Sequence, residues 1–140
     1  MFYKNLFKSV ACIAILMLMT SCGGLKTKEV ILDDCIKIPA QSIKLAVNDY
    51  SDEEETDIDL ESTITIEALK DSHGTVYMKL YDKDDVELIK LIGDELPKDA
   101  GQKKKCNFGL SWFEEKTKEE LNDIIKQTDH VKFESNLSKD

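Results

Sequence analysis

The chain alternates hydrophobic and polar residues over several short stretches, which is the pattern of β-strands with one buried face. The clearest alternation covers residues 58–68, where Ile, Leu, Ser and Ala positions face one way and Asp, Glu and Thr positions face the other. Similar alternation predicts further strands over residues 30–38, 43–48, 75–82, 86–92, 106–112 and 131–134. Charged or glycine-containing turns separate these stretches, so consecutive strands are expected to pair antiparallel.

The hydrophobic period changes at Thr117. The sequence Thr117-Lys-Glu-Glu120 is a capping box, in which the Thr hydroxyl and the Glu carboxylate bind each other's backbone N–H groups. Leu121, Ile124 and Ile125 then fall on one stripe at helical spacing. A short helix near residues 117–128 is therefore predicted. Together these elements indicate a mostly β fold, either an immunoglobulin-like antiparallel β-sandwich or a small β-barrel.

Residues 1–21 have the composition of a secretory signal. Lys4 and Lys8 precede an apolar run over residues 10–19, which is shorter than the roughly 20 residues needed to span a membrane. The ending Met19-Thr20-Ser21-Cys22 resembles the processing box of bacterial lipoproteins, with Met19 where Leu is usual. The resemblance implies cleavage between Ser21 and Cys22 and a diacylglycerol on the Cys22 thiol. The alternatives are an ordinary secreted protein cut near Ser21 and an uncleaved membrane anchor.

This interpretation divides the chain into a signal peptide (residues 1–21), a lipidated N-terminus with a flexible tether (22–29) and a single β-rich domain (30–140). Residue 23 is Gly rather than the Asp that the resemblance associates with inner-membrane retention. In a cell with two membranes, the expected location is therefore the outer membrane, facing the periplasm.

A second resemblance lies in the middle of the chain. The stretch Met78-Lys-Leu-Tyr-Asp82, followed by Lys-Asp-Asp-Val-Glu-Leu, is similar to the core motif of the FxLYD family of small secreted bacterial β-sandwich domains. The similarity covers about residues 60–110, with Met78 in place of Phe and Asp85 in place of the turn glycine. It implies a binding or structural module, and it supplies no active-site residues.

Charge excludes one class of partner. The 140-residue chain has a net charge of −9, a pI near 4.8 and 19 basic residues, all of them Lys. Nucleic-acid binding needs clustered positive charge, and Arg is the usual bidentate reader of phosphate and guanine. No nucleic-acid partner is expected.

Two cysteines remain after the leader and the lipid acceptor are set aside, namely Cys35 and Cys106. Outside the cytoplasm they can form a disulfide, which would close a loop of about 70 residues and stabilise the fold by about 4 kcal/mol. Cys106 lies on the apolar side of its predicted strand, whereas Cys35 lies opposite Val30 and Leu32. The alternative is two independent buried thiols. No CxxC pair or neighbouring His supports a metal site.

Acidic side chains crowd two places, residues 52–59 and the turn with Asp82, Asp84 and Asp85. Such a turn is a candidate calcium site, but the spaced acidic residues and central Gly of a calcium loop are missing, and a solvated acidic face is the alternative. His73 and His130 show no nucleophile motif around them. We therefore expect no enzyme activity and no cofactor.

Tyr77 and Tyr81 share the polar face of one predicted strand, and Phe113 follows Trp112 on the opposite side of another. Exposed aromatic side chains are enriched in interfaces, so these three residues are the candidate partner-facing patch. The alternative is that the predicted helix covers the two tyrosines.

These observations predict a lipid-anchored cell-envelope protein with a non-catalytic binding or structural domain. Its anchor would be Cys22 in the membrane, and its partner a protein or glycan of the envelope. One alternative is a small-molecule or lipid carrier with an apolar cavity. Another is an inhibitor of a periplasmic hydrolase, which would project a rigid loop from residues 48–57 or 93–105.

Overall fold

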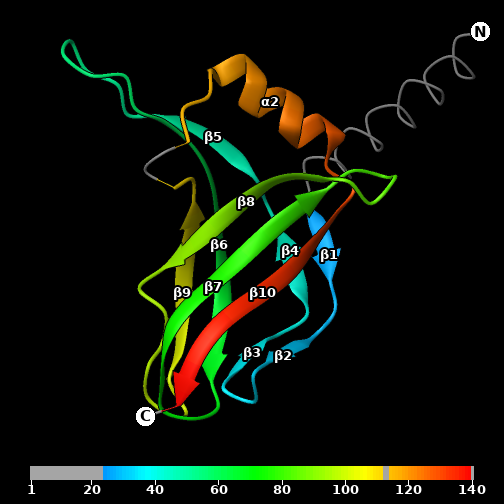
Figure 1. Cartoon of the computed structure of the whole chain (residues 1–140), viewed down its shortest axis with the longest axis vertical. Helices are drawn as coiled ribbons and strands as arrows, with labels where there is room; N and C mark the ends of the chain where they lie inside the picture. Colours follow the sequence, from blue (N-terminus) through cyan, green and yellow to red (C-terminus); the bar gives the residue numbers. More distant parts are fainter. Residues whose placement is uncertain (1–23, 112–113, 140) are drawn as a thin grey trace, which may run out of the picture.

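Strands dominate the domain, with one helix late in the chain, as the alternation of residues predicts (Figure 1). The structure is a computed structural model that describes residues 24–111 and 114–139. Its elements are β1 (Leu25–Thr27), β2 (Val30–Leu32), β3 (Ile36–Ile38), β4 (Gln41–Ile43), β5 (Ala46–Asp49), β6 (Ile58–Ala68), β7 (Ser72–Tyr81), β8 (Glu87–Asp94), β9 (Lys103–Gly109), α2 (Lys118–Gln127) and β10 (His130–Lys139). The predicted mostly β class with one short helix is confirmed.

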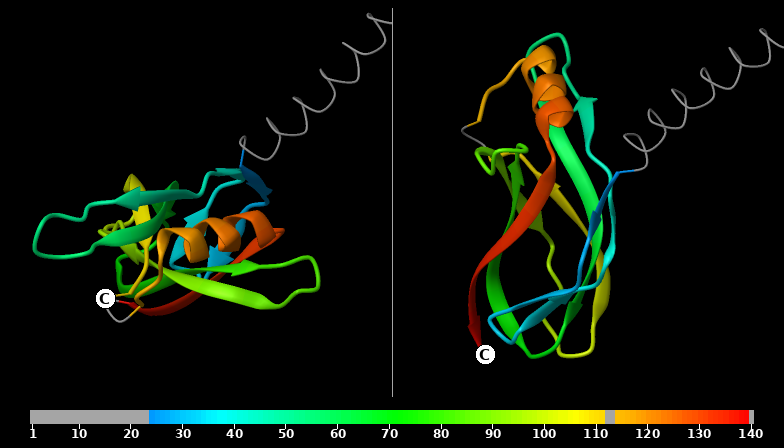
Figure 2. Two further views of the ribbon diagram at one scale, coloured as in Figure 1. Left: turned by 90° about the horizontal axis from the view of Figure 1, so that it is seen from above. Right: turned by 90° about the vertical axis from the view of Figure 1, so that its right-hand side faces the viewer.

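One antiparallel sheet forms the body of the domain. Its strands follow the order β10-β7-β8-β9-β6-β3-β2, with β5 paired to the first part of β6. The sheet curls until its end strands β10 and β2 come into contact, and Ser135 Oγ of β10 donates a hydrogen bond to Asp33 Oδ2 beside β2 at 2.6 Å. Figure 2 shows this closure from two further sides. Of the two expected architectures, the domain has the nearly closed, barrel-like one, because the twist of the long strands β6 and β7 accumulates around the sheet.

The interior of this barrel is filled with side chains. The predicted inward face of β6 is buried from Leu60 through Ala68, and Val76, Met78 and Leu80 of β7 lie opposite it. Phe108 of β9 is fully buried and packs edge to face against Phe133 of β10. The buried core consists of Leu32, Cys35, Ile36, Ile38, Ile43, Leu60, Ile64, Ile66, Val76, Met78, Leu80, Ile89, Leu91, Cys106, Phe108 and Leu121. In small barrels such side chains fill the interior and leave no open channel.

Helix α2 closes one end of the barrel (Figure 2). Its predicted capping box is present: Glu120 N donates to Thr117 Oγ1 at 3.1 Å, and Thr117 N donates to Glu120 Oε1 at 3.3 Å. Leu121 is fully buried, and the helix packs on β5 and β6. The helix ends at Thr128, whose N–H and hydroxyl both bond to Ile124 O.

The predicted strand 30–38 is instead a hairpin. Asp33 and Asp34 have φ angles of 51° and 58°, and Cys35 N donates to Leu32 O at 2.9 Å. Two successive left-handed residues make the tight turn that matches strand twist, and Asp tolerates this conformation. The turn places Cys35 on the buried side. The stretch predicted as a tether is also partly a strand, because β1 pairs with β4.

The predicted strand 43–48 is divided between β4 and β5. The side chain of Gln41 links β4 to β6. The Gln41 amide donates from Nε2 to Thr65 O at 3.0 Å and accepts at Oε1 from Thr65 N at 2.9 Å. This pair of bonds reproduces what a neighbouring strand would give to β6. The irregular segment can therefore follow the edge of β6 without leaving its backbone groups unpaired. No helix in the described part of the chain is long and apolar enough to cross a membrane.

Candidate functional site

Tyr77, Lys79 and Tyr81 occupy alternate outward positions of β7. We use the name tyrosine face for these three residues together with the outward side chains beside them on β8 and β10. In the sheet register Tyr77 lies between Glu134 and Ile92, Lys79 between Lys132 and Lys90, and Tyr81 between His130 and Glu87. The two tyrosines are half-buried. Helix α2 packs on β5 and β6 rather than here, so the alternative in which it covers the tyrosines is wrong.

Cationic side chains cover the rings of both tyrosines. Lys90 Nζ lies 4.6 Å from the centre of the Tyr77 ring, and Lys132 Nζ lies 4.6 Å from that of Tyr81. The His130 ring stacks on Tyr81 with 5.4 Å between centroids and 8° between planes. Cation–π contacts of this kind contribute about 0.5–1 kcal/mol each at exposed sites. They hold the rings in fixed orientations.

Ion pairs link the cations of this face to carboxylates. Lys79 pairs with Glu134 at 2.5 Å and with Glu87 at 3.3 Å. The hydrogen bond to Glu134 raises the pKa of Lys79, and the hydrogen bond to Glu87 raises it further. The hydrogen bond from Lys79 lowers the pKa of Glu134. These groups are solvated, so the pairs fix geometry more than they add stability.

The turn after β7 is tied to the start of β10 through Asp85. Its carboxylate accepts hydrogen bonds from His130 Nε2 and from Lys132 Nζ, and both nitrogens lie 2.8 Å from Asp85 Oδ1. The hydrogen bond from Lys132, then the one from His130, lowers the pKa of Asp85. The second ring nitrogen, Nδ1, lies 2.9 Å from Asp129 Oδ2. Contacts first with Asp129 and then with Asp85 raise the pKa of His130 from 6.5.

This arrangement predicts a pH-dependent contact. Because the folded pKa of His130 is raised, its stabilising charge is fully present below about pH 6.5 and is lost as the pH rises through the folded value. His130→Gln should therefore lower the melting temperature more at pH 5.5 than at pH 8.5. An NMR titration should give a His130 pKa above 6.5. The control is Lys132→Gln, whose effect should be alike at both pH values because Lys stays charged. An equal His130→Gln effect at both pH values would contradict the assignment.

Two carboxylates of the acidic turn, the calcium candidate, are used in local contacts. Asp82 Oδ1 accepts from the backbone N–H groups of Asp84 and Val86, each at 2.9 Å, while Asp85 pairs with the cations of β10. Asp85 also has a left-handed φ of 61°. Among residues 24–111 and 114–139, no group of three or more His, Cys, Asp or Glu side chains is arranged to hold a metal ion.

Cys35 and Cys106 are both free thiols with 1% exposure. Cys35 O accepts from Leu69 N, whereas Cys106 pairs with Ile64, so the cysteines lie on opposite edges of β6 and are offset along it. Five residues of strand correspond to about 16 Å, and a disulfide needs Cα atoms within about 7 Å. The disulfide is therefore not formed, and the alternative of two buried thiols holds. Burial raises the pKa of the Cys106 thiol.

The two histidines lie at opposite ends of the β7–β10 pair, because His130 is opposite Tyr81 and His73 is opposite Ser138. His130 contacts two carboxylates, but its side chain is 36% exposed and the site is not desolvated. Phe113, the third residue of the predicted patch, and Cys22 lie outside the described residues. No local pattern in the sequence identified His130 and Lys132 as the partners of Tyr81, because both lie on a distant strand.

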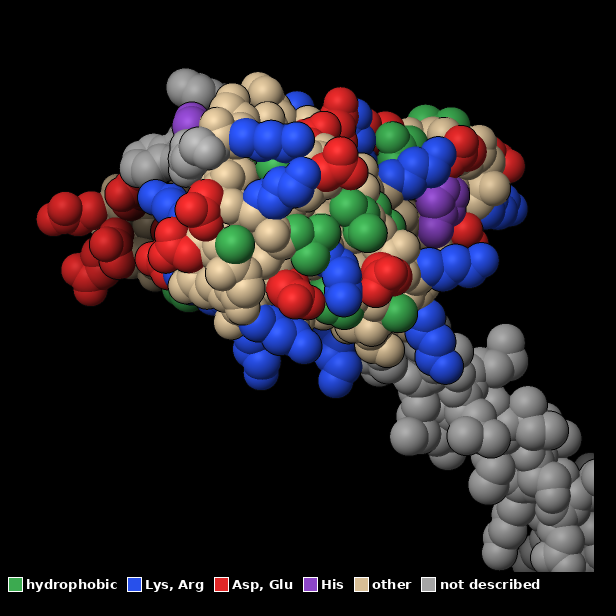
Figure 3. Space-filling model, turned by 90° about the horizontal axis from the view of Figure 1, so that it is seen from below, with side chains coloured by type: hydrophobic (Ala, Val, Ile, Leu, Met, Phe, Trp, Pro, Cys, Tyr) green, Lys and Arg blue, Asp and Glu red, His purple; other side chains and the backbone are tan. Residues whose placement is uncertain are grey.

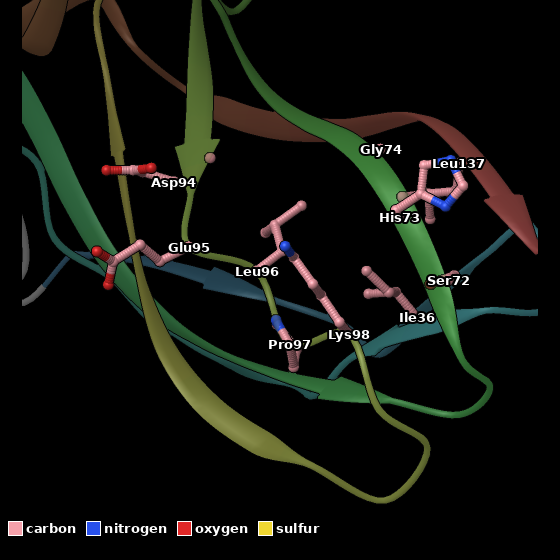
Figure 4. Close-up of a pocket in the computed structure, with 11 residues that line it drawn as sticks. Ile36, Ser72, His73, Gly74, Asp94, Glu95, Leu96, Pro97, Lys98 and Leu137 are labelled. Atoms are coloured by element: carbon pink, nitrogen blue, oxygen red, sulfur yellow. The ribbon is translucent and has the colours of Figure 1, made fainter. Parts of the chain in front are cut away.

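A pocket lies where β7 starts and β10 ends, at the end of the barrel opposite α2 in Figure 1, and Figure 4 shows the residues that line it. Its volume is about 360 Å³, and it is formed by the start of β7, the end of β8, the following loop, β3 and β10. Ile36, Leu96 and Leu137 contribute apolar walls. Ser72, whose hydroxyl is buried and has no hydrogen-bond partner, lies on the inward side of β7. Figure 3 views this end and shows apolar side chains in its middle, among lysines and acidic side chains.

Comparison with protein-family models, with curated proteins and with solved structures finds no match for this chain. The resemblances to lipoproteins and to FxLYD domains therefore remain predictions from the sequence.

Proposed function

We propose that this protein is a lipid-anchored component of the bacterial cell envelope whose barrel domain binds a partner without catalysing a reaction. The signal-like residues 1–21 and the acceptor position of Cys22 support the anchor. Lipid chains contribute about 0.8 kcal/mol per buried CH₂, so two or three chains on one residue make dissociation very slow. The proposed location is the outer membrane, facing the periplasm.

The observation that carries the binding role is the tyrosine face. Two half-buried aromatic rings lie on a sheet face that no helix in the described part of the chain covers, and a lysine ammonium group lies over each ring. Side chains that are already ordered lose less entropy when a partner binds. Tyr is also enriched at protein interfaces. The partner we propose is an envelope protein or glycan, because the balanced charges here do not favour a polyanion.

The anchor is tested by Cys22→Ala. The wild-type protein should fractionate with membranes and need detergent for release. The variant should appear in the soluble fraction or as unprocessed precursor, because it has no thiol to accept the lipid. Immunoblotting of separated inner and outer membranes measures both. A conservative control is Cys12→Ala, which removes a leader thiol and should leave fractionation unchanged. Membrane retention of processed Cys22→Ala would contradict the proposal.

The binding face is tested by crosslinking in intact cells, comparing the wild type with Tyr77→Ala/Tyr81→Ala. The matched control is Tyr50→Ala, which removes a tyrosine that is 58% exposed and lies away from this face. A defined crosslinked species should be lost in the double variant and kept in the control. Retention in the double variant would exclude the face as the binding site.

A second candidate function, hydrolase inhibition, is favoured by the connection between β5 and β6. Residues 50–57 project beyond the barrel (Figure 1) and are internally bonded: Tyr50 N donates to Asp57 O at 2.7 Å, and Asp52 N donates to Glu55 O at 2.9 Å. An ordered, protruding loop is what an inhibitor inserts into an enzyme cleft. Loss of the crosslinked species with Tyr50→Ala alone would favour this function.

A further inference from the structure

We propose that the basic ribbon, which consists of residues 24–28 and 40–44 around the β1–β4 pair, is the surface by which the barrel lies on anionic phospholipid headgroups. This inference rests on the proposed lipid anchor at Cys22 and adds the orientation that the domain takes on the bilayer. The surface is separate from the tyrosine face, which lies on β7, β8 and β10.

The basic ribbon starts next to the proposed anchor. β1 begins at Leu25, three residues after Cys22, and three residues span at most about 11 Å. The ribbon is fastened to the barrel, because Thr27 Oγ1 donates to Gln41 O at 3.1 Å and the Gln41 amide bonds to the backbone of Thr65 in β6. A lipid on Cys22 therefore brings this part of the barrel to the bilayer surface.

Three lysines share the outward face of the basic ribbon. Lys26, Lys28 and Lys44 occupy alternate positions of the two antiparallel segments, and all three are exposed. Leu25 and Ile43, which lie opposite each other at positions between these lysines, pack on the core. Because side chains alternate along a strand, the three lysines belong to the face that points away from the core. Residues 24–28 and 39–48 contain no Asp or Glu.

The charge of these lysines is not neutralised by carboxylates of the barrel. None of the three forms an ion pair within the described part of the chain. Glu29, which follows the ribbon in sequence, pairs with Lys37 at 3.6 Å. On β6, Glu61 lies opposite β5 and Glu67 lies opposite β3, on either side of the ribbon. The ammonium groups are therefore available to headgroup phosphates, and each lysine near an anionic bilayer strengthens the attraction about fivefold.

The acidic part of the chain favours the same orientation. The net charge is −9, and residues 52–57 carry five carboxylates and no lysine. These residues lie in the connection that projects from the side of the barrel opposite β1 (Figure 1, Figure 2). An anionic bilayer attracts the basic ribbon and repels this connection, so attraction and repulsion turn the barrel the same way.

The test uses the full protein extracted from membranes and placed in nanodiscs of phosphatidylcholine, alone or with phosphatidylglycerol as about a quarter of the lipid. A trace of lipid with a gadolinium-chelating headgroup enhances the relaxation of amides near the surface. In the mixed nanodiscs, the amides of β1 and β4 should show the largest enhancement and those of residues 52–57 the smallest. This difference should shrink in phosphatidylcholine alone and at high salt, which screens the charges.

The triple variant Lys26→Gln/Lys28→Gln/Lys44→Gln removes the charge of the basic ribbon. It should lower the ratio of molecules in headgroup contact to molecules in other orientations by up to about 100-fold in the mixed nanodiscs. The enhancement at β1 and β4 should then fall to its value in phosphatidylcholine alone. Intact mass checks that the variant carries lipid, and its melting temperature should equal that of the wild type because all three positions are exposed.

The matched control is Lys70→Gln/Lys98→Gln/Lys103→Gln, which removes three exposed lysines where β6 ends and β7 starts. It should keep the wild-type enhancement. In lipidated protein, equal enhancement for the wild type and the ribbon variant, or a maximum elsewhere on the barrel, would overturn this inference and leave the anchor intact. Ribbon amides that respond to protein concentration rather than to phosphatidylglycerol would assign the ribbon to a second copy of the chain and overturn it as well. Protein without lipid that does not stay with nanodiscs would overturn both proposals.

Discussion

Replacing Phe108 by Ala is expected to lower the free energy of unfolding by about 3–5 kcal/mol. The ring is fully buried, meets Phe133 edge to face with 6.4 Å between centroids, and lies against the backbone of β8. A Cβ on Gly93 would come within 2.9 Å of two of its ring carbons. The backbone of β8 and the Phe133 ring of β10 both contact the Phe108 ring. The cavity left by the substitution can therefore collapse only in part.

Urea unfolding measures this effect, with the m value checked for constancy. Phe108→Leu is the matched control, since it keeps most of the apolar volume and should cost clearly less. A loss below about 0.5 kcal/mol, as for a surface position, would contradict the placement of Phe108 at the centre of the barrel.

Gly74→Ala is expected to have the second large effect, because two costs add. Gly74 has a φ of 140°, which L-residues rarely adopt, and this conformation costs about 1–3 kcal/mol. Its Cβ would also lie 2.1 Å from Asn136 O of β10, and relieving such an overlap costs about another 1–3 kcal/mol. The substitution should therefore force β10 away from the start of β7.

Gly101→Ala separates these two costs. Gly101 also has a left-handed φ, of 87°, but a Cβ there meets nothing within 4 Å. Its loss of stability should reflect the backbone conformation alone and should be clearly smaller. Hydrogen exchange in β10 should accelerate for Gly74→Ala only. Equal losses for the two variants would show that the close approach of β7 and β10 is not formed.

Local patterns in the sequence predicted the parts of the fold that depend on neighbouring residues. Alternation identified β6 and its buried face from Leu60 to Ala68, and the capping box at Thr117 identified the start of α2. Both signals arise within a few residues, where the period of side-chain direction and the bonding of helix ends are decided. The hairpin at Asp33 and Asp34 was missed because two acidic residues are an unusual choice for a left-handed turn.

The arrangement that depends on distant residues was not predictable in the same way. Whether the sheet closes into a barrel depends on the twist summed over all its strands. The bonds of Gln41 to Thr65 and of Asp85 to His130 join positions that are 24 and 45 residues apart. The pocket at Ser72 likewise needs four separate segments of the chain to meet. The tyrosine face was identified from the alternation in β7, but its covering cations come from β8 and β10.

The proposed lipid on the sulfur atom of Cys22 can be measured by intact-mass spectrometry of protein extracted from native membranes. We expect the mass of a chain that begins at Cys22 and carries a diacylglyceryl group on that residue. A free thiol at residue 22, or a mass that still includes residues 1–21, would contradict it.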